Sequence, residues 1–170
     1  MAGQLVQVAT ETVTSAVASV SLVGINTDDV YMVAINNFVP VSDGVDPITR
    51  VTVSGTAQST SNYDRAIKIL KANTSFGDVT GTNRSAFDVL TGAGTGEGEQ
   101  NNAILYLYNF NSSSEYSFIS VENCANNASN NFFGSQGGAV YTVQETHDGI
   151  SFSLSSGNIA SGTFTLYKVL

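Results

Sequence analysis

An unbroken run of apolar and aromatic residues near the middle of the chain constrains the fold more than any other stretch. The segment Ala103–Phe110 (Ala-Ile-Leu-Tyr-Leu-Tyr-Asn-Phe) contains neither glycine nor proline. A run of this kind, bordered by turn-forming residues, predicts a strand at the centre of a packed core with both faces buried. A glycine-rich stretch precedes it at 92–102, and the short polar break at 111–114 predicts a hairpin into a second strand at 116–121.

The rest of the chain carries short strand-like segments separated by turn residues. Residues 150–154 alternate strictly between apolar residues and serine, which is typical of a strand with one wet face. Further strands are predicted at 4–8, 13–22, 30–35, 48–54, 63–70, 86–90, 139–144 and 163–170. A helix is the alternative for 13–22 and for 63–70, and the all-β setting favours strands. Polar connections or turns are predicted at 36–37, 56–62, 74–84, 122–131 and 134–138.

About ten short strands with regular turn residues predict an all-β fold, a two-sheet antiparallel sandwich of jelly-roll type. A chain of 170 residues with 42% hydrophobic content is expected to form one such domain. Residues 23–170 are expected to make the sandwich, and residues 1–22 an N-terminal arm with the first strands. The expected core comprises Tyr31, Val33, Ile35, Ile104, Leu105, Tyr106, Leu107, Phe118, Phe152 and Leu166.

Charge and composition exclude several classes of function. Only 12% of residues are charged, against about 25% in typical soluble domains. The net charge of −8 is the wrong sign for nucleic-acid binding, which needs a basic patch. A single cysteine, Cys124, excludes an intrachain disulfide framework. We expect no membrane partner, because no window approaches the ~18 apolar residues of a membrane span. The first residues show no pattern of a secretory signal.

Residues that could carry chemistry are few. The lone His147 lies between Glu145 and Asp148 at an expected hairpin tip, and no G-x-S-x-G motif accompanies it. We therefore assign no catalytic residue and expect replacement of His147 to leave activity intact. One histidine and one cysteine exclude a zinc site. Calcium at 28–29 or 43–46 is an alternative to simple turn formation by aspartate, and no metal or cofactor is predicted.

Sugar chemistry is a further alternative. A glycosidase would need two carboxylates across a groove, and Glu115, Glu122 and Asp88 are candidates only in that general sense. A sugar-binding cleft needs aromatic platforms beside amide side chains. The chain has seven tyrosines and many asparagines but no tryptophan, and most of the tyrosines fall on predicted strands. Core packing is therefore the expected role of most tyrosines.

Three segments carry a resemblance to a known family. They are 29–37 (Asp-Val-Tyr-Met-Val-Ala-Ile-Asn-Asn), 105–111 (Leu-Tyr-Leu-Tyr-Asn-Phe-Asn) and the ending from Ile150 through Ser156-Gly157-Asn158-Ile159 to Tyr167. Together they resemble the small virion structural proteins of marine and freshwater tailed bacteriophages, often cyanophages. The motifs are packing and turn patterns rather than chemical signatures. The resemblance implies a jelly-roll-like, non-enzymatic, multi-copy protein on the particle exterior, made in the host cytoplasm.

The expected function is that of a capsid decoration (cement) subunit, which stabilises the shell through contacts with its own copies, as a trimer, and with the major capsid protein. The alternative is a tail, collar or fibre component that binds a host surface glycan. Grouped, solvent-facing tyrosines near asparagine would favour glycan binding, and an apolar rim with a docked arm would favour assembly. The N-terminal stretch is more apolar than one edge strand needs, so residues 1–13 are expected to be ordered by a neighbouring subunit. The predicted interface residues are Leu5, Val6, Val8, Val13 and Val17.

Overall fold

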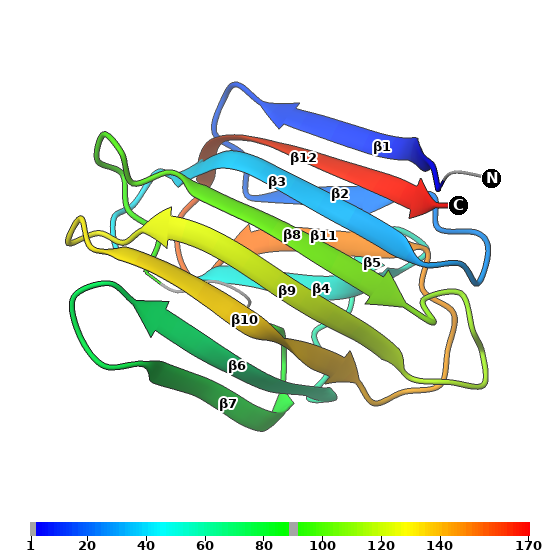
Figure 1. Cartoon of the computed structure of the whole chain (residues 1–170). Coiled ribbons are helices and arrows are strands. Elements are labelled where there is room, and N and C mark those ends of the chain that lie inside the picture. Colours follow the sequence, from blue (N-terminus) through cyan, green and yellow to red (C-terminus); the bar gives the residue numbers. More distant parts are fainter. Residues whose placement is uncertain (1–2, 89–91) are drawn as a thin grey trace.

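The computed structural model describes residues 3–88 and 92–170 and shows two antiparallel sheets in those ranges (Figure 1). The strands are β1 (Leu5–Val13), β2 (Ser19–Val23), β3 (Tyr31–Pro40), β4 (Pro47–Val53), β5 (Thr56–Ala57), β6 (Tyr63–Lys71), β7 (Gly77–Arg84), β8 (Asn101–Tyr108), β9 (Ser117–Asn126), β10 (Phe132–Tyr141), β11 (Gly149–Leu154) and β12 (Ile159–Val169). The described residues include no helix that is long and apolar enough to span a membrane.

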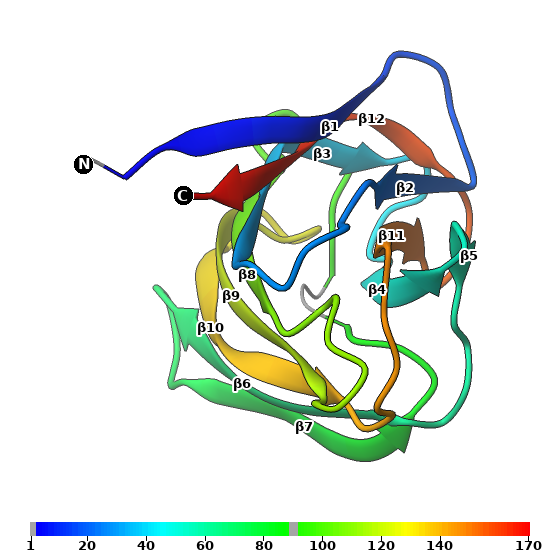
Figure 2. The same ribbon diagram turned by 90° about the vertical axis from the view of Figure 1, so that its right-hand side faces the viewer.

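The strand order confirms a jelly-roll sandwich. The large sheet has the order β1-β12-β3-β8-β9-β10-β6-β7, and the small sheet has the order β2-β11-β4-β5. The chain alternates between the sheets from β1 to β4, and on its return β11 inserts between β2 and β4 while β12 inserts between β1 and β3. This nesting of returning strands is typical of jelly rolls. Figure 2 shows the large sheet curving around the small one.

The core lies between the two sheets and takes alternate residues from each strand. On β8, Leu105 and Leu107 are fully buried, whereas Ile104 and Tyr106 remain 44% and 39% exposed. The prediction that both faces of this strand are buried is therefore wrong, because the small sheet covers only the inner face of the large sheet. Phe118 on β9 is also exposed, against expectation. The remaining members of the predicted core are buried: Tyr31, Val33, Ile35, Leu105, Leu107, Phe152 and Leu166.

Several polar or glycine-rich segments form strands that the sequence did not predict. The expected connection at 74–84 contains the edge strand β7, and the expected turns at 122–131 and 134–138 overlap β9 and β10. Pairing with a neighbouring strand satisfies backbone groups whatever the side chains are. Gly137 of β10 lies so close to β6 that a Cβ atom would overlap the carbonyl oxygen of Ala66. Glycine thus permits close strand contact here instead of making a turn.

The other predicted strands and breaks can be compared with the structure in the same way. The expected strand at 63–70 is confirmed as β6, and the hairpin after β8 is confirmed as β8–β9. The break expected at 36–37 is a bulge within β3, where Asn37 has a φ of 52° and its N–H donates to Asn102 Oδ1 at 3.0 Å. Of the strand expected at 86–90, Phe87 exchanges two backbone hydrogen bonds with Thr49 (2.7 and 2.9 Å). Residues 89–90 lie outside the described residues.

The N-terminal segment belongs to the sandwich and is not a free arm. Strand β1 pairs along its length with β12 of the same chain, from Leu5 opposite Val169 to Val13 opposite Gly162. The described part of residues 1–13 is therefore ordered within its own chain, which corrects the expectation that a neighbouring subunit orders it. The sequence did not reveal this pairing, because the residues that pair with β1 lie about 150 residues away or more, a separation beyond the reach of local patterns.

We expect Leu105→Ala to lower the free energy of unfolding by ~2–5 kcal/mol, because the side chain is fully buried between Val33 and Val121 on the neighbouring strands. Chemical denaturation followed by circular dichroism measures the loss. Ile104→Ala on the same strand is the matched control and is expected to cost clearly less, because Ile104 is exposed. Equal losses in the two variants would show that the inner face of β8 is not the core.

Candidate functional site

The only histidine is buried at the seam between the two sheets, and the expectation of a hairpin tip is wrong. The backbone N–H of His147 donates to the carbonyl oxygen of Phe110 at 2.6 Å. Its ring packs edge-on between those of Phe110 and Tyr141, with centroids 5.8 and 5.1 Å away. The loop after β10 thus folds inward, so that His147 fills space between the ends of β8, β9 and β10.

Two polar side chains face the His147 ring. Ser117 Oγ lies 2.7 Å from Nδ1, and Glu145 Oε1 lies 3.5 Å from Nε2. With the proton on Nε2, Ser117 donates to Nδ1 and the ring N–H faces the carboxylate; with the proton on Nδ1, the ring donates to Ser117, whose hydroxyl then donates to the carbonyl oxygen of Asn109 at 3.3 Å. The set has the composition of a Ser-His-acid triad. However, Ser117 is 1% exposed and His147 fully buried, so no substrate reaches the hydroxyl in this conformation.

The loop that carries His147 therefore links the two sheets through its side-chain and backbone contacts. Burial lowers the pKa of His147, and the nearby Glu145 and Asp148 carboxylates oppose this shift only in part. The next residue, Asp148, adds contacts with the small sheet. It accepts hydrogen bonds from Thr52 Oγ1 on β4 at 2.7 Å and from the N–H of Gly55 at 2.8 Å. The single sequence clue to this role was a histidine beside two acids, which does not reveal that the loop turns inward.

The loop aspartates organise the backbone. Asp29 forms an ion pair with Lys168 (2.6 Å), and this contact lowers the pKa of Asp29. Asp46 Oδ1 accepts from the N–H of Gly92 at 2.8 Å, and Asp43 Oδ1 accepts from the N–H of Thr95 at 3.1 Å. Among the described residues, no group of three or more His, Cys, Asp or Glu side chains gathers as a metal site would require.

The acids that were considered for a glycosidase are engaged in separate contacts. Asp88 binds Arg65 and, at 3.4 Å, Arg84. Glu122 accepts from Gln136 Nε2 at 2.9 Å on the outer face of the large sheet. Glu115 is exposed in the turn between β8 and β9. The structure does not bring these acids together across a groove.

An aromatic band on the outer face of the large sheet is the most distinctive exposed feature. We define it as Tyr106, Tyr108, Tyr116 and Phe118, which are 38–44% exposed. Tyr108 lies directly opposite Phe118 on the neighbouring strand. Asn109 donates to the carbonyl oxygen of Tyr116 at 3.4 Å. Tyr31, Tyr63 and Tyr141 are buried in the core, as expected, whereas the tyrosines of the band are exposed.

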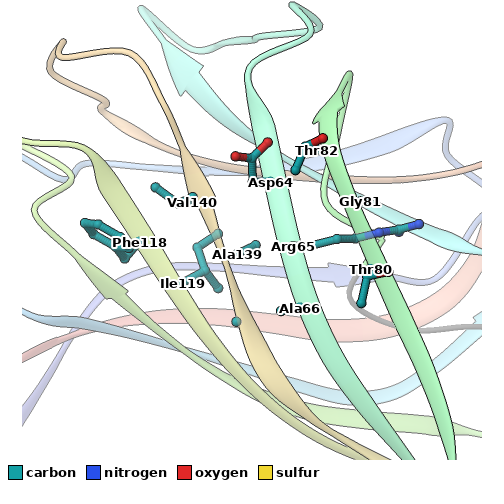
Figure 3. Close-up of a pocket in the computed structure, with 11 residues that line it drawn as sticks. Asp64, Arg65, Ala66, Thr80, Gly81, Thr82, Phe118, Ile119, Ala139 and Val140 are labelled. Atoms are coloured by element: carbon teal, nitrogen blue, oxygen red, sulfur yellow. The ribbon is translucent and has the colours of Figure 1, made fainter.

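Beside the band the outer face is hollowed, over β9, β10, β6 and β7 (Figure 3). The hollow has a volume of about 630 Å³. Phe118 and Val140 form one wall, and Asp64, Thr80 and Thr82 form the other. Nothing in the sequence pattern indicated this hollow, because its residues come from two strand pairs, β6–β7 and β9–β10, that are separated along the chain.

The predicted interface residues divide into two groups. Leu5 and Val6 are 48% and 39% exposed at the start of β1, beside the exposed Leu170. Val8 and Val17 are half-buried and pack against the chain's own core, and Val13 is buried within it. Only the first two offer apolar side chains to another molecule.

The chain matches no known protein-family model and no curated protein.

We expect acid to weaken the fold through His147. Its pKa is lowered in the folded state, so below its ordinary value of 6.5 the unfolded chain binds a proton that the folded chain does not. The free energy of unfolding should therefore fall from about pH 6.5 downward, by at most ~1.4 kcal/mol per pH unit for one proton. Urea denaturation at a series of pH values between about 7.5 and 5 measures this slope.

His147→Gln removes the titrating ring while keeping a polar side chain. The variant should be less stable at neutral pH, because a buried ring is lost, and its slope between about pH 6.5 and 5 should be shallower than that of the parent protein. The expectation that replacing His147 leaves activity intact stays a prediction, and it concerns activity rather than stability. Parallel pH profiles in the two proteins would rule out His147 as the source of the acid sensitivity.

Proposed function

We propose that this protein is a non-enzymatic structural subunit of a bacteriophage virion, present in many copies on the particle exterior, with capsid decoration as its role. The single observation that carries the proposal is the exposed edge strand β1. It spans nine residues, carries Glu11 as its one charged residue, and begins with the exposed apolar pair Leu5 and Val6. The jelly-roll topology and the resemblance of three segments to virion structural proteins support the same role.

An edge strand of this kind favours association. One side of β1 pairs with β12, and no strand of the described chain pairs with its other side. Exposed N–H and C=O groups along such an edge can pair with a strand of another molecule. The opposite edge, β7, differs because it carries Asp78, Asn83 and Arg84 among its eight residues. Charged and polar residues on an edge discourage pairing.

Strand addition at the free side of β1 is the proposed mode of contact, in place of the expected ordering of residues 1–13 by a neighbouring subunit. In this arrangement β1 stays in its own sheet, and a neighbour pairs with its free side. The proposed neighbours are further copies of the chain, as a trimer, and the major capsid protein. Because each copy carries a net charge of −8, free copies repel one another weakly, so association is favoured on the particle surface rather than in solution.

The double variant Leu5→Glu/Val6→Glu tests the β1 edge. Two carboxylates at the start of this edge, which otherwise carries Glu11 as its one charge, should prevent strand addition, and the variant should stay folded because both side chains are exposed. We expect loss of occupancy on reconstituted particles, measured against the parent protein. Thr74→Glu/Phe76→Glu, an equal charge change in the exposed turn between β6 and β7, is the matched control. Unchanged assembly of the β1 variant would refute the edge contact.

A density map of the intact virion tests the role itself. Location of this chain over the shell, with β1 at a subunit contact, is the expected result. Its absence from the particle would overturn the proposal as a whole, whereas a position on the tail, collar or fibre would support the second candidate. That candidate, a host-recognition component, is favoured by one observation, the grouping of exposed Tyr106, Tyr108 and Tyr116 beside Asn109.

A further inference from the structure

We propose that the hollow beside the aromatic band is a binding site for a neutral oligosaccharide. The site consists of Phe118 and Val140 on one wall, Asp64, Thr80 and Thr82 on the other, and a floor of Gly138 and Ala66. The inference goes beyond the structural role and does not depend on it, because the site lies on a different part of the large sheet from β1.

The apolar wall follows from strand register. Tyr108, Phe118 and Val140 are consecutive partners on β8, β9 and β10, and the next partner on β6 is Asp64. Neighbouring strands are spaced ~4.8 Å apart, so this row runs for roughly 14 Å across the sheet. A pyranose ring has a C–H-rich face that stacks on an aromatic ring, and Phe118 and Tyr108 offer two such rings at the start of the row.

The hollow itself exists because two floor residues are small. Gly138 pairs with Ala66, and Ala66 pairs with Thr80, in the row beside Phe118 and Val140. A Cβ atom at position 138 would come within 2.8 Å of the Ile119 carbonyl oxygen, so glycine is required there by close backbone packing. The missing side chains leave a depression at the foot of the apolar wall (Figure 3).

The opposite wall supplies hydrogen-bonding groups. Asp64 Oδ1 accepts from the N–H of Asn83 at 2.8 Å, which fixes the carboxylate, and its Oδ2 accepts no hydrogen bond from the chain as described. The hydroxyls of the exposed Thr80 and Thr82 are likewise without partners among the described residues. A sugar that stacks on Phe118 can donate its hydroxyls to Asp64 and exchange hydrogen bonds with the threonines. Apolar walls with a few fixed polar groups are typical of ligand sites.

The charges around the hollow favour a neutral sugar over an anionic one. Asp64 lines it, Glu122 lies on the same outer face, and the chain as a whole carries a net charge of −8. The nearby cations are engaged, because Arg65 binds Asp88 and Lys68 binds Asp78 at 2.8 Å. Sulfated or uronic-acid sugars would meet repulsion here without a free cation to offset it.

The aromatic area of the band by itself falls short of the area that contact with a second copy of the chain would need. An aromatic side chain contributes roughly 150–250 Å² when it is fully covered. At about 40% exposure, the four rings of the band offer roughly 250–400 Å², against the ~800 Å² per partner of a stable protein interface. An area of this size suits a short oligosaccharide.

An array of immobilised neutral hexose and N-acetylhexosamine oligosaccharides, with sulfated and uronic-acid glycans alongside, tests the proposal. We expect the full chain to bind one or more neutral glycans and to leave the anionic ones unbound. Phe118→Ala should weaken binding of the best neutral glycan about tenfold or more, as measured by titration. Ala66→Leu, which fills the hollow from an exposed position, should do the same. Phe76→Ala removes an exposed aromatic ring outside the band and should leave binding unchanged.

Binding to no neutral glycan, preference for the anionic glycans, or undiminished binding by Phe118→Ala would each overturn the proposal. A change in the sedimentation of Phe118→Ala without any loss of glycan binding would assign the band to contact between copies and would also overturn it. Circular dichroism confirms that each variant is folded. Leu5→Glu/Val6→Glu should bind glycan as the parent protein does, so that failure of the structural role and failure of the glycan site are told apart.

Discussion

The structure depends on one constraint: a four-stranded sheet must cover the inner face of an eight-stranded one. The small sheet satisfies it by lying inside the curve of the large sheet, so that Leu105, Leu107 and their neighbours are fully buried while the alternate residues face solvent (Figure 2). The described residues form no helix that could cover the outer face, and Ile104, Tyr106, Tyr108 and Phe118 on that face are 38–44% exposed. The exposed aromatic residues on β8 and β9 are therefore a direct consequence of the architecture. An exposed apolar patch of this kind indicates an interaction surface.

Because the two sheets differ in size, loops must close the space between their ends. The loop between β10 and β11 does this with two residues. His147 contacts Phe110 in the turn after β8 and Ser117 and Tyr141 in the large sheet, and Asp148 contacts β4 and the turn after it. Desolvation keeps the ring neutral near physiological pH. Ser117, His147 and Glu145 thus make the contacts of a hydrolase triad. Ser117 and His147 are buried, however, so no substrate reaches the serine hydroxyl in this conformation, and catalysis needs access as well as geometry.

Local pattern was enough to predict the jelly roll, the hairpin after β8 and most of the core. It failed where a residue's burial or secondary structure depends on neighbouring strands or on the layer that covers the sheet. The run at 103–108 is apolar at every position, and only the absence of a second covering layer exposes Tyr106. Strand β7 has polar, weakly strand-forming residues and is held by pairing with β6. The hollow needs Gly138, Ala66 and Phe118 to fall into register on three strands, and no segment of the sequence contains that information.

The two proposed surfaces can act together because strand order separates them. Strand β1 is one border of the large sheet, and β12, β3 and β8 lie between it and β9, where the hollow begins. Four strand spacings of ~4.8 Å place the nearest wall of the hollow roughly 19 Å from the β1 edge. A neighbour that adds a strand at β1 extends the sheet sideways and leaves the outer face open. A repeated subunit joined in this way would present many weak glycan sites on one side, and multivalency would raise their combined avidity without any new contact.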